Sequence, residues 1–242
     1  MNRKAYKLLN QVNLTPTVNL ILGDCLEVMP SLPKFDFLWA DPPYNVGKPY
    51  ENHNDSMPHA EYMRFIKNFL VLAAQVSNAF AIYPPKIHLR EFWNLLPNHH
   101  LLIVGYSPSG PRRSNYFHQY VPILVPQKPV KTVPDFWYNV KLPSFGWYYH
   151  EERFAHPAQT SLDLTKRIIE SFTLPGQSVL DPFSGTGTTA IACLELGRNC
   201  TLIENSQEYF NLAQNRIKAY SSQVPLPFNS AQNPPVGLMP KG

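Results

Sequence analysis

The sequence predicts an α/β fold in which a mostly parallel β-sheet carries helices on both faces. Three observations support this prediction. Short apolar runs rich in β-branched and aromatic residues recur along the chain, amphipathic segments lie between them, and the alternation resumes after an irregular stretch at residues 105–150. Strands that alternate with helices are typical of parallel sheets, because each helix returns the chain to the start of the next strand.

The apolar runs have the length and composition of buried strands. Two of them end directly before an aspartate, TVNLILG before Asp24 and FDFLWA before Asp41. The predicted strands cover residues 17–23, 35–40, 78–83, 101–106, 121–126, 177–183 and 199–204.

Apolar residues at helical spacing predict the helices. The clearest stripe runs from Tyr62 to Ala73, with apolar residues at i, i+3, i+4, i+7, i+8 and i+11. Ser206, with Glu208 close behind it, gives the last helix an N-terminal capping signal. One helix is predicted around this stripe, and a second follows Pro84-Pro85 and ends at about Leu96. Further helices are predicted over residues 162–172, 188–196 and 206–220.

Length and composition limit the class of protein. A chain of 242 residues with 44% hydrophobic residues can bury a substantial core in one large or two small domains. No run is long enough for a membrane span, and the first residues lack the pattern of a signal peptide, so we expect a cytoplasmic protein without a membrane partner. The three cysteines show no paired spacing, so we expect reduced thiols and no metal site.

Residues 105–150 differ from their surroundings. These 46 residues hold 7 of the 25 prolines and 11 aromatic residues, and their five basic residues against Asp135 give a formal charge of +4. We predict a basic insertion here, between two halves of one domain at 1–104 and 151–220, with a flexible tail at 221–242. Its basic residues are candidates for contact with a polyanionic partner such as a nucleic acid, and the alternative is a solvated loop with aromatic anchors. These residues are Arg112, Arg113, Lys128, Lys131 and Lys141.

A glycine-containing loop stands between a predicted strand and a predicted helix. In DPFSGTGTTA, Gly185, Gly187 and Ala190 have G-x-G-x-x-A spacing, and Glu204 ends the next strand. Such a loop brings backbone N–H groups and a helix N-terminus close to a ligand, and the carboxylate can accept hydrogen bonds from ribose hydroxyls. The loop alone fits a dinucleotide or S-adenosylmethionine, although Asp181 or Thr186 beside it favours a zwitterionic ligand.

The tetrapeptide Asp41-Pro42-Pro43-Tyr44 follows directly on a predicted strand. Ligands of open parallel sheets bind beyond the carboxyl ends of the strands, so this tetrapeptide and the glycine loop are expected at one crevice. The Asp41 carboxylate and the rigid Pro42 carbonyl can accept two N–H bonds of an exocyclic amino group, while the Tyr44 ring can stack on the base.

These two motifs resemble those of the S-adenosylmethionine-dependent amino-group DNA methyltransferases. The resemblance extends from about Asn19 to Lys218, and the order of DPPY before FSGTG is similar to their circularly permuted β-type arrangement. It implies a Rossmann-like methyltransferase fold with catalysis by Asp41, Pro42, Pro43 and Tyr44. The implied cofactor-binding residues are Asp24, Cys25, Asp181, Pro182, Phe183, Ser184, Gly185, Thr186, Gly187, Thr188, Glu204 and Asn205.

Two segments depart from the family pattern. HPAQTSLDLTKRII at 156–169 resembles the helix-leading motif that completes the cofactor pocket in the family. That motif usually reads H-P-T-Q-K-P, and here Thr160 and Ser161 stand in place of Lys-Pro. His118-Gln119 stands where His-Glu is common. Neither departure is expected to touch the chemistry, although the first removes a cation and a rigid helix start.

The resemblance implies direct methyl transfer to the amino group of a flipped-out adenine in DNA, without a covalent enzyme intermediate. An aspartate-headed DPPY resembles adenine-modifying members more than cytosine-modifying ones, so cytosine N4 methylation stays an alternative. A nicotinamide-dependent oxidoreductase or a catalytically silent nucleic-acid-binding relative are alternatives of other classes. The resemblance also suggests a monomer or homodimer in a restriction-modification setting, with a separate nuclease that shares the target site.

Overall fold

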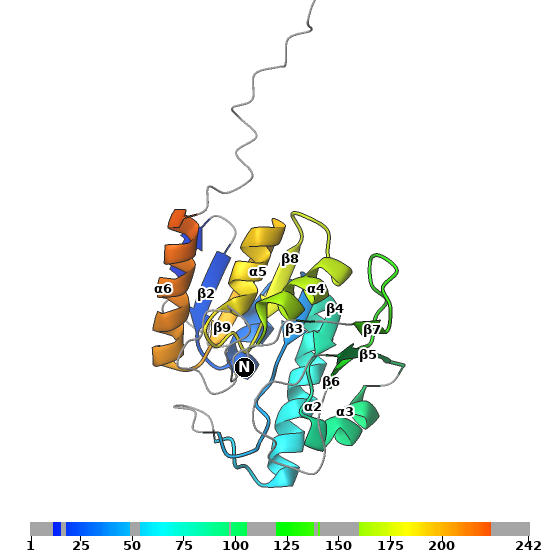
Figure 1. Ribbon diagram of the computed structural model, residues 1–242. Helices are drawn as coiled ribbons and strands as arrows, with labels where there is room; N and C mark the ends of the chain where they lie inside the picture. Colours follow the sequence, from blue (N-terminus) through cyan, green and yellow to red (C-terminus); the bar gives the residue numbers. More distant parts are fainter. Residues whose placement is uncertain are drawn as a thin grey trace, which may run out of the picture.

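The computed structural model describes residues 12–15, 18–48, 54–96, 98–105, 120–137, 140 and 160–223. The strands among them form one sheet in the order β1-β2-β9-β8-β3-β4-β6-β5-β7 (Figure 1). The strands are β1 (Val12–Thr15), β2 (Val18–Leu22), β3 (Phe35–Ala40), β4 (Ser77–Ile82), β5 (His100–Gly105), β6 (Tyr120–Val125), β7 (Phe136–Trp137), β8 (Ser178–Asp181) and β9 (Asn199–Glu204).

The centre of the sheet is parallel. Strands β2, β9, β8, β3 and β4 run in one direction, whereas β1 at one edge and β6 next to β4 are antiparallel to their neighbours. The strands of a parallel sheet are covered on both faces, which explains why their sequences are mostly apolar and do not alternate strictly between apolar and polar residues. In β3, five of the six residues are buried.

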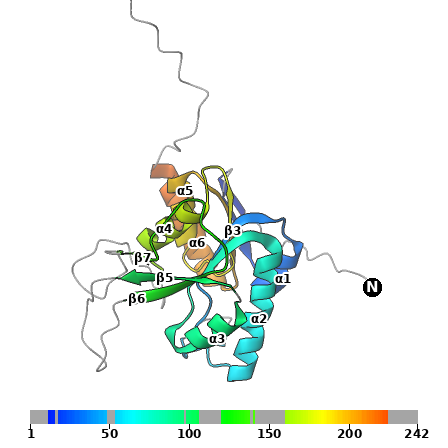
Figure 2. The same ribbon diagram turned by 90° about the vertical axis from the view of Figure 1, so that its right-hand side faces the viewer.

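Two layers of helices cover the sheet, as the two views of Figures 1 and 2 show. One face carries α4 (Leu162–Phe172), α5 (Thr188–Leu196) and α6 (Gln207–Gln223). The other carries α1 (Cys25–Val28), α2 (His59–Val76) and α3 (Leu89–Leu95), together with the short 3-10 turns η1 (Met29–Ser31) and η2 (Lys86–His88). The mostly parallel sheet with helices on both faces is therefore confirmed.

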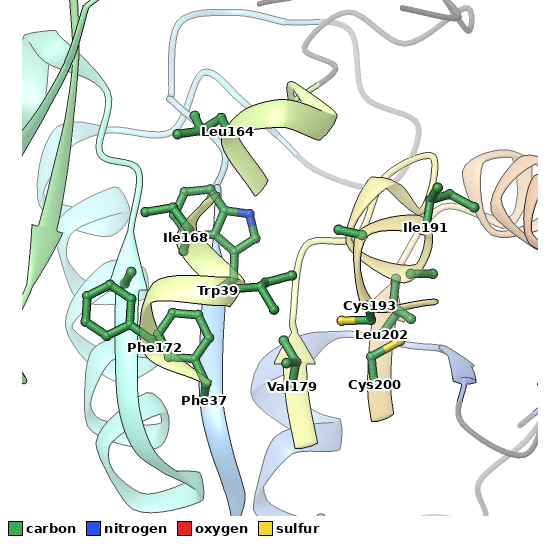
Figure 3. Close-up of a cluster of buried hydrophobic side chains, with 14 of the residues drawn as sticks. Phe37, Trp39, Leu164, Ile168, Phe172, Val179, Ile191, Cys193, Cys200 and Leu202 are labelled. Atoms are coloured by element: carbon green, nitrogen blue, oxygen red, sulfur yellow. The ribbon is translucent and has the colours of Figure 1, made fainter. Parts of the chain in front are cut away.

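Large side chains fill the space between the sheet and the layer of α4 to α6. Figure 3 shows Phe37 and Trp39 of β3 facing Ile168 and Phe172 of α4. The rings of Phe37 and Phe172 stack with centroids 5.1 Å apart. Cys193 and Cys200 meet in the same core, and all three cysteines are buried and free, as expected for reduced thiols.

Several elements match their predictions closely. The predicted strands at 35–40 and 199–204 and the predicted helices at 162–172 and 188–196 have the observed bounds. Ser206 accepts a hydrogen bond from the backbone of Tyr209, which confirms it as a capping residue. The short elements β1, α1 and β7 were not predicted, and α6 continues to Gln223, three residues beyond the predicted helix.

The predicted insertion contributes to the central sheet. β6 lies between β4 and β5: it pairs with β5 along its whole length and with β4 through Ile82 and Leu124. β7 extends the sheet beyond β5. The described part of this region is therefore built into the same sheet as the rest of the domain. Residues 106–119, 138–139 and 141–150 lie outside the described residues, as does the tail beyond residue 223. Among the described helices, none is long and apolar enough to cross a membrane.

Candidate functional site

The two motifs meet because their strands are neighbours. β3 and β8 pair in parallel with Leu38 opposite Leu180, so the segments that follow them leave the same edge of the sheet. They line a cavity of about 1010 Å³, a volume that includes its open mouth. The expected convergence of the tetrapeptide and the glycine loop is confirmed, although 140 residues separate Asp41 from Asp181.

Almost all predicted site residues line this cavity. The exception among the catalytic and cofactor-binding predictions is Gly187. Residues that were not predicted also line it: Gly23, Trp39, Phe65, Thr160, Thr189, Ile203, Ser206 and Tyr209. Half of them directly adjoin predicted residues in sequence, whereas Phe65 belongs to the apolar stripe of α2 and carried no signal of its own.

Asp41 is partly exposed in the wall of the cavity. Its Oδ2 accepts a hydrogen bond of 2.6 Å from the Thr160 hydroxyl, and the Tyr44 hydroxyl also bonds to it. Burial raises the pKa of Asp41 to about 7, and the nearby Asp181 carboxylate adds to this rise, while the two hydroxyl donors oppose it. Asp41 is therefore a carboxyl that can change its protonation state near neutral pH.

A residue of α2 anchors the backbone of the tetrapeptide. The Tyr62 hydroxyl, on a fully buried side chain, donates a 2.9 Å hydrogen bond to the Pro43 carbonyl. The Pro42 carbonyl accepts no hydrogen bond from another described residue. The Pro42 carbonyl, which is predicted to accept an N–H bond of the substrate, is thus distinct from the Pro43 carbonyl, which anchors the loop.

The chain after the tetrapeptide is held by a buried carboxylate. Asp55 accepts hydrogen bonds from the backbone N–H groups of Asn45, Val46 and Lys48 at 2.7, 3.1 and 2.8 Å. Asn45 adopts a φ of 54°, a left-handed conformation that asparagine tolerates, and its side chain bonds to the backbone of Met57. These contacts close the loop and fix the direction in which it leaves the cavity.

The glycine loop is tied to the ends of two strands. Asp181 accepts from the backbone of Phe183 at 2.9 Å and from the Thr189 hydroxyl. Glu204 accepts from the backbones of Gly185 and Ser206 at 2.8 and 2.9 Å. Each carboxylate oxygen has a second lone pair, so these internal bonds leave acceptor sites for a ligand.

Arg216 supports the loop from α6. Its Nη1 donates to the Thr186 carbonyl at 3.2 Å and to the Thr188 hydroxyl at 3.1 Å. A single arginine in a polar helix carries no local signal for this contact, so sequence reasoning missed it.

Gly187, the second glycine of the loop, lies where α5 begins and α6 passes close by. It does not line the cavity; it lies at the start of α5 with a φ of 79°, and a Cβ there would come within 3.2 Å of the Ala213 Cβ on α6. The structure gives this glycine a role in the fold, since it permits a left-handed turn and the close approach of α6. Its contact with a cofactor stays a prediction.

Thr160 and Ser161, the two residues that replace Lys-Pro of the family motif, also lie at the site. Thr160 bonds directly to Asp41, so the expectation that this position does not touch the chemistry was wrong. Ser161 accepts a hydrogen bond from the Leu164 backbone and caps α4, which replaces the rigid proline start by a side-chain cap.

The cavity is acidic. Burial raises the pKa of Asp181 to about 6 and that of Glu204 to about 7, as it does for Asp41, and we call these three residues the cavity carboxyls. None of the described residues that line the cavity is Lys, Arg or His. Such surroundings favour a positively charged ligand and disfavour a pyrophosphate.

The predicted DNA-contacting residues are only partly described. Arg112, Arg113 and Lys141 lie outside the described residues, as does His118-Gln119. Lys128 is exposed after β6, whereas Lys131 forms an ion pair of 3.5 Å with Glu170 of α4. Of the two lysines, Lys128 is the better placed to meet a phosphate.

Comparison with known proteins identifies relatives of similar size. Residues 89–215 match the N6/N4 methyltransferase family model, described as DNA methylase; this is more than half of the chain and includes the glycine loop but begins after the tetrapeptide. The DNA adenine methyltransferase YhdJ of Escherichia coli (strain K12) is 25% identical, with 84% of this chain and 83% of YhdJ covered.

Solved structures agree on the fold. The crystal structure of an M1.HpyAVI–SAM complex superposes with a TM-score of 0.60 at 25% identity, covering 82% of this chain and 99% of that one. The cytosine-N4-specific PvuII DNA methyltransferase reaches a TM-score of 0.64 at 15% identity, covering 86% and 93%. The Rossmann-like fold expected from the resemblance is confirmed.

Proposed function

The chain belongs to the N6/N4 DNA methylase family, and on that premise we propose that it transfers a methyl group from S-adenosylmethionine to the N6 amino group of adenine in DNA. The observation that carries this proposal is the meeting of the DPPY tetrapeptide and the glycine loop in one acidic cavity.

The cavity fits S-adenosylmethionine in charge and in hydrogen-bonding capacity. The cavity carboxyls complement a sulfonium cation and an ammonium group, while the buried Ser184 hydroxyl has no partner among the described residues and is available to a ligand. We assign Glu204 to the ribose hydroxyls, Asp24 to the adenine end and Asp181 to the methionine end. When bound, S-adenosylmethionine supplies an electrophilic methyl group.

The tetrapeptide supplies the groups that activate an amine. The lone pair of an exocyclic NH2 is delocalised into its base, so the amine is a weak nucleophile. The Asp41 carboxylate and the Pro42 carbonyl accept its two N–H bonds, which favours tetrahedral geometry and concentrates the lone pair on nitrogen. Tyr44 packs against the flipped base, and its hydroxyl and that of Thr160 hold Asp41 in place beforehand.

Asp41 is suited to receive a proton. A pKa of about 7 lets the carboxylate exist at neutral pH and still take up the proton that the methylated amine must lose. A carboxyl with an ordinary pKa near 4 would be a weaker base.

The acidic cavity opposes the oxidoreductase alternative. A nicotinamide dinucleotide would bring two phosphate charges to a cavity that contains the three cavity carboxyls and, among its described lining residues, no Lys, Arg or His. The choice of adenine over cytosine is supported by the aspartate-headed tetrapeptide and by the similarity to YhdJ. Residues 105–150 remain our proposed contact with the DNA target.

The experiment that tests this function is methyl transfer with identification of the product. The protein is incubated with tritiated S-adenosylmethionine and unmethylated DNA, and the labelled nucleoside is identified after digestion. N6-methyladenine is the expected product; N4-methylcytosine would refute the base choice, and no label in DNA would refute the activity. Asp41→Ala should abolish transfer while cofactor binding, measured by calorimetry, survives.

A further inference from the structure

A cluster of metal-ligating side chains lies outside the cavity, on the face of the sheet that α2 and α3 cover. His59 is the first residue of α2, His88 ends η2, and Glu91 lies in the first turn of α3. One ligand atom from each of them falls within 4.8 Å of the others. Figures 1 and 2 both show α2 and α3 side by side at this end of the molecule.

His88 is the unusual member of this cluster. Its side chain is 9% exposed, and neither ring nitrogen has a hydrogen-bond partner among the described residues. The centroid of its ring is 5.5 Å from that of His59 and 4.9 Å from that of Tyr62. A buried donor or acceptor without a partner is costly, so a ring nitrogen at this position calls for a ligand.

We propose that His59, His88 and Glu91 bind a divalent transition metal ion, and that Zn²⁺ suits the set best. Two imidazoles and one carboxylate with an open fourth position are a recurrent zinc ligand set. Tetrahedral ligands stand about 3.4 Å apart, so the cluster must contract slightly. His59 is exposed and free to make that movement, because it begins its helix on the surface.

Such an ion would fix the catalytic loop from outside the cavity. It would join the start of α2 to α3, and Tyr62, which packs on His88, donates the hydrogen bond that anchors the Pro43 carbonyl. An ion pair between His59 and Glu91, whose Nε2 and Oε1 atoms are 4.0 Å apart, would account for the positions of these two side chains. It would leave His88 without a partner among the described residues. The spacing His88-x-x-Glu91 is the signal in the sequence, whereas the prediction of no metal site rested on the spacing of the cysteines.

The proposal is tested by titrating the full chain with Co²⁺ and with Zn²⁺. One equivalent of Co²⁺ should give the intense visible absorption of a tetrahedral site, and Zn²⁺ should displace it. Zn²⁺ at a hundredfold excess over its dissociation constant should raise the melting temperature by about 5 to 10 °C. Neither readout depends on methyl transfer, so the result is independent of the proposed function.

Matched variants assign the ligands. His59→Ala and Glu91→Gln should each weaken Co²⁺ binding at least tenfold and remove the thermal shift, whereas His100→Ala, which removes another exposed histidine, should preserve both. Weak absorption typical of six-coordinate Co²⁺, or full binding in the His59→Ala protein, would overturn the proposal.

Discussion

The hydrogen bond from Thr160 to Asp41 allows the proposed chemistry to be tested through its pH dependence. Thr160→Val removes a donor that lies 2.6 Å from Oδ2 and keeps the shape of the side chain. This donor stabilises the ionised form of Asp41, so its loss must raise the pKa of Asp41 further above about 7.

The size of the effect follows from the charge on the acceptor. A hydrogen bond to a charged group contributes about 1.5 to 3 kcal/mol, and a change of one in pKa corresponds to about 1.4 kcal/mol. The pKa should therefore rise by about 1 to 2. At pH 7 the ionised fraction of Asp41 would fall from about one half to between about 1% and 10%, so methyl transfer should slow about 5- to 50-fold.

The assay is single-turnover methyl transfer between pH 5.5 and 9.5 with preformed protein–cofactor complex. The Thr160→Val profile should have the wild-type shape displaced toward higher pH and should recover most of the wild-type rate at its alkaline end. Thr160→Ser keeps the hydroxyl and serves as the control, with a profile close to wild type. If the Thr160→Val and wild-type profiles superimpose, Thr160 does not control the ionisation of Asp41.

Three further predictions concern stability and DNA binding. Gly187→Ala should lower the melting temperature more than Gly176→Ala. Both residues have a positive φ, 79° and 84°, but only at Gly187 would the new Cβ crowd Ala213. Each additional kcal/mol lost from the free energy of unfolding corresponds to about 2–4 °C in melting temperature. Equal melting temperatures would remove the role we assign to close packing against α6. The cavity carboxyls have pKa values raised by burial, so they stabilise the folded chain fully below about pH 4 and lose this contribution as pH rises through about 6 to 7. The urea midpoint of the cofactor-free protein should accordingly be lower at pH 8 than at pH 5, and a midpoint that rises would contradict this. Lys128→Ala should weaken DNA binding and flatten its log–log salt dependence by about 0.9, measured by fluorescence anisotropy. Lys131→Ala should have a smaller effect because Glu170 already pairs with that lysine, and the reverse order would count against this assignment.

The sequence predicted those features that depend on local pattern. The strands β3 and β9 and the helices α4 and α5 have the expected bounds because their apolar periods and flanking turns are contained in the segments themselves. The convergence of the two motifs was also predictable, since parallel strands present their carboxyl ends at one edge of a sheet.

Other features that depend on contacts between distant segments were not predictable. Thr160 lies 119 residues from Asp41, and no local rule pairs them. The glycine spacing identified Gly187 but could not show that α6 passes beside it. Likewise, β6 has an ordinary strand composition, and only the assembled sheet shows that it separates β4 from β5.

The order of strands in the sheet constrains how the chain folds as it is synthesised. β2 and β3 are formed early, yet β9 and β8 stand between them. Until residues 178–204 emerge from the ribosome, the early strands have no partner across this gap and expose edges that can pair wrongly. The methyl-transfer centre is therefore assembled only after residues 178–204 have been synthesised, and products truncated before residue 178 should be inactive because they lack the central strands β8 and β9.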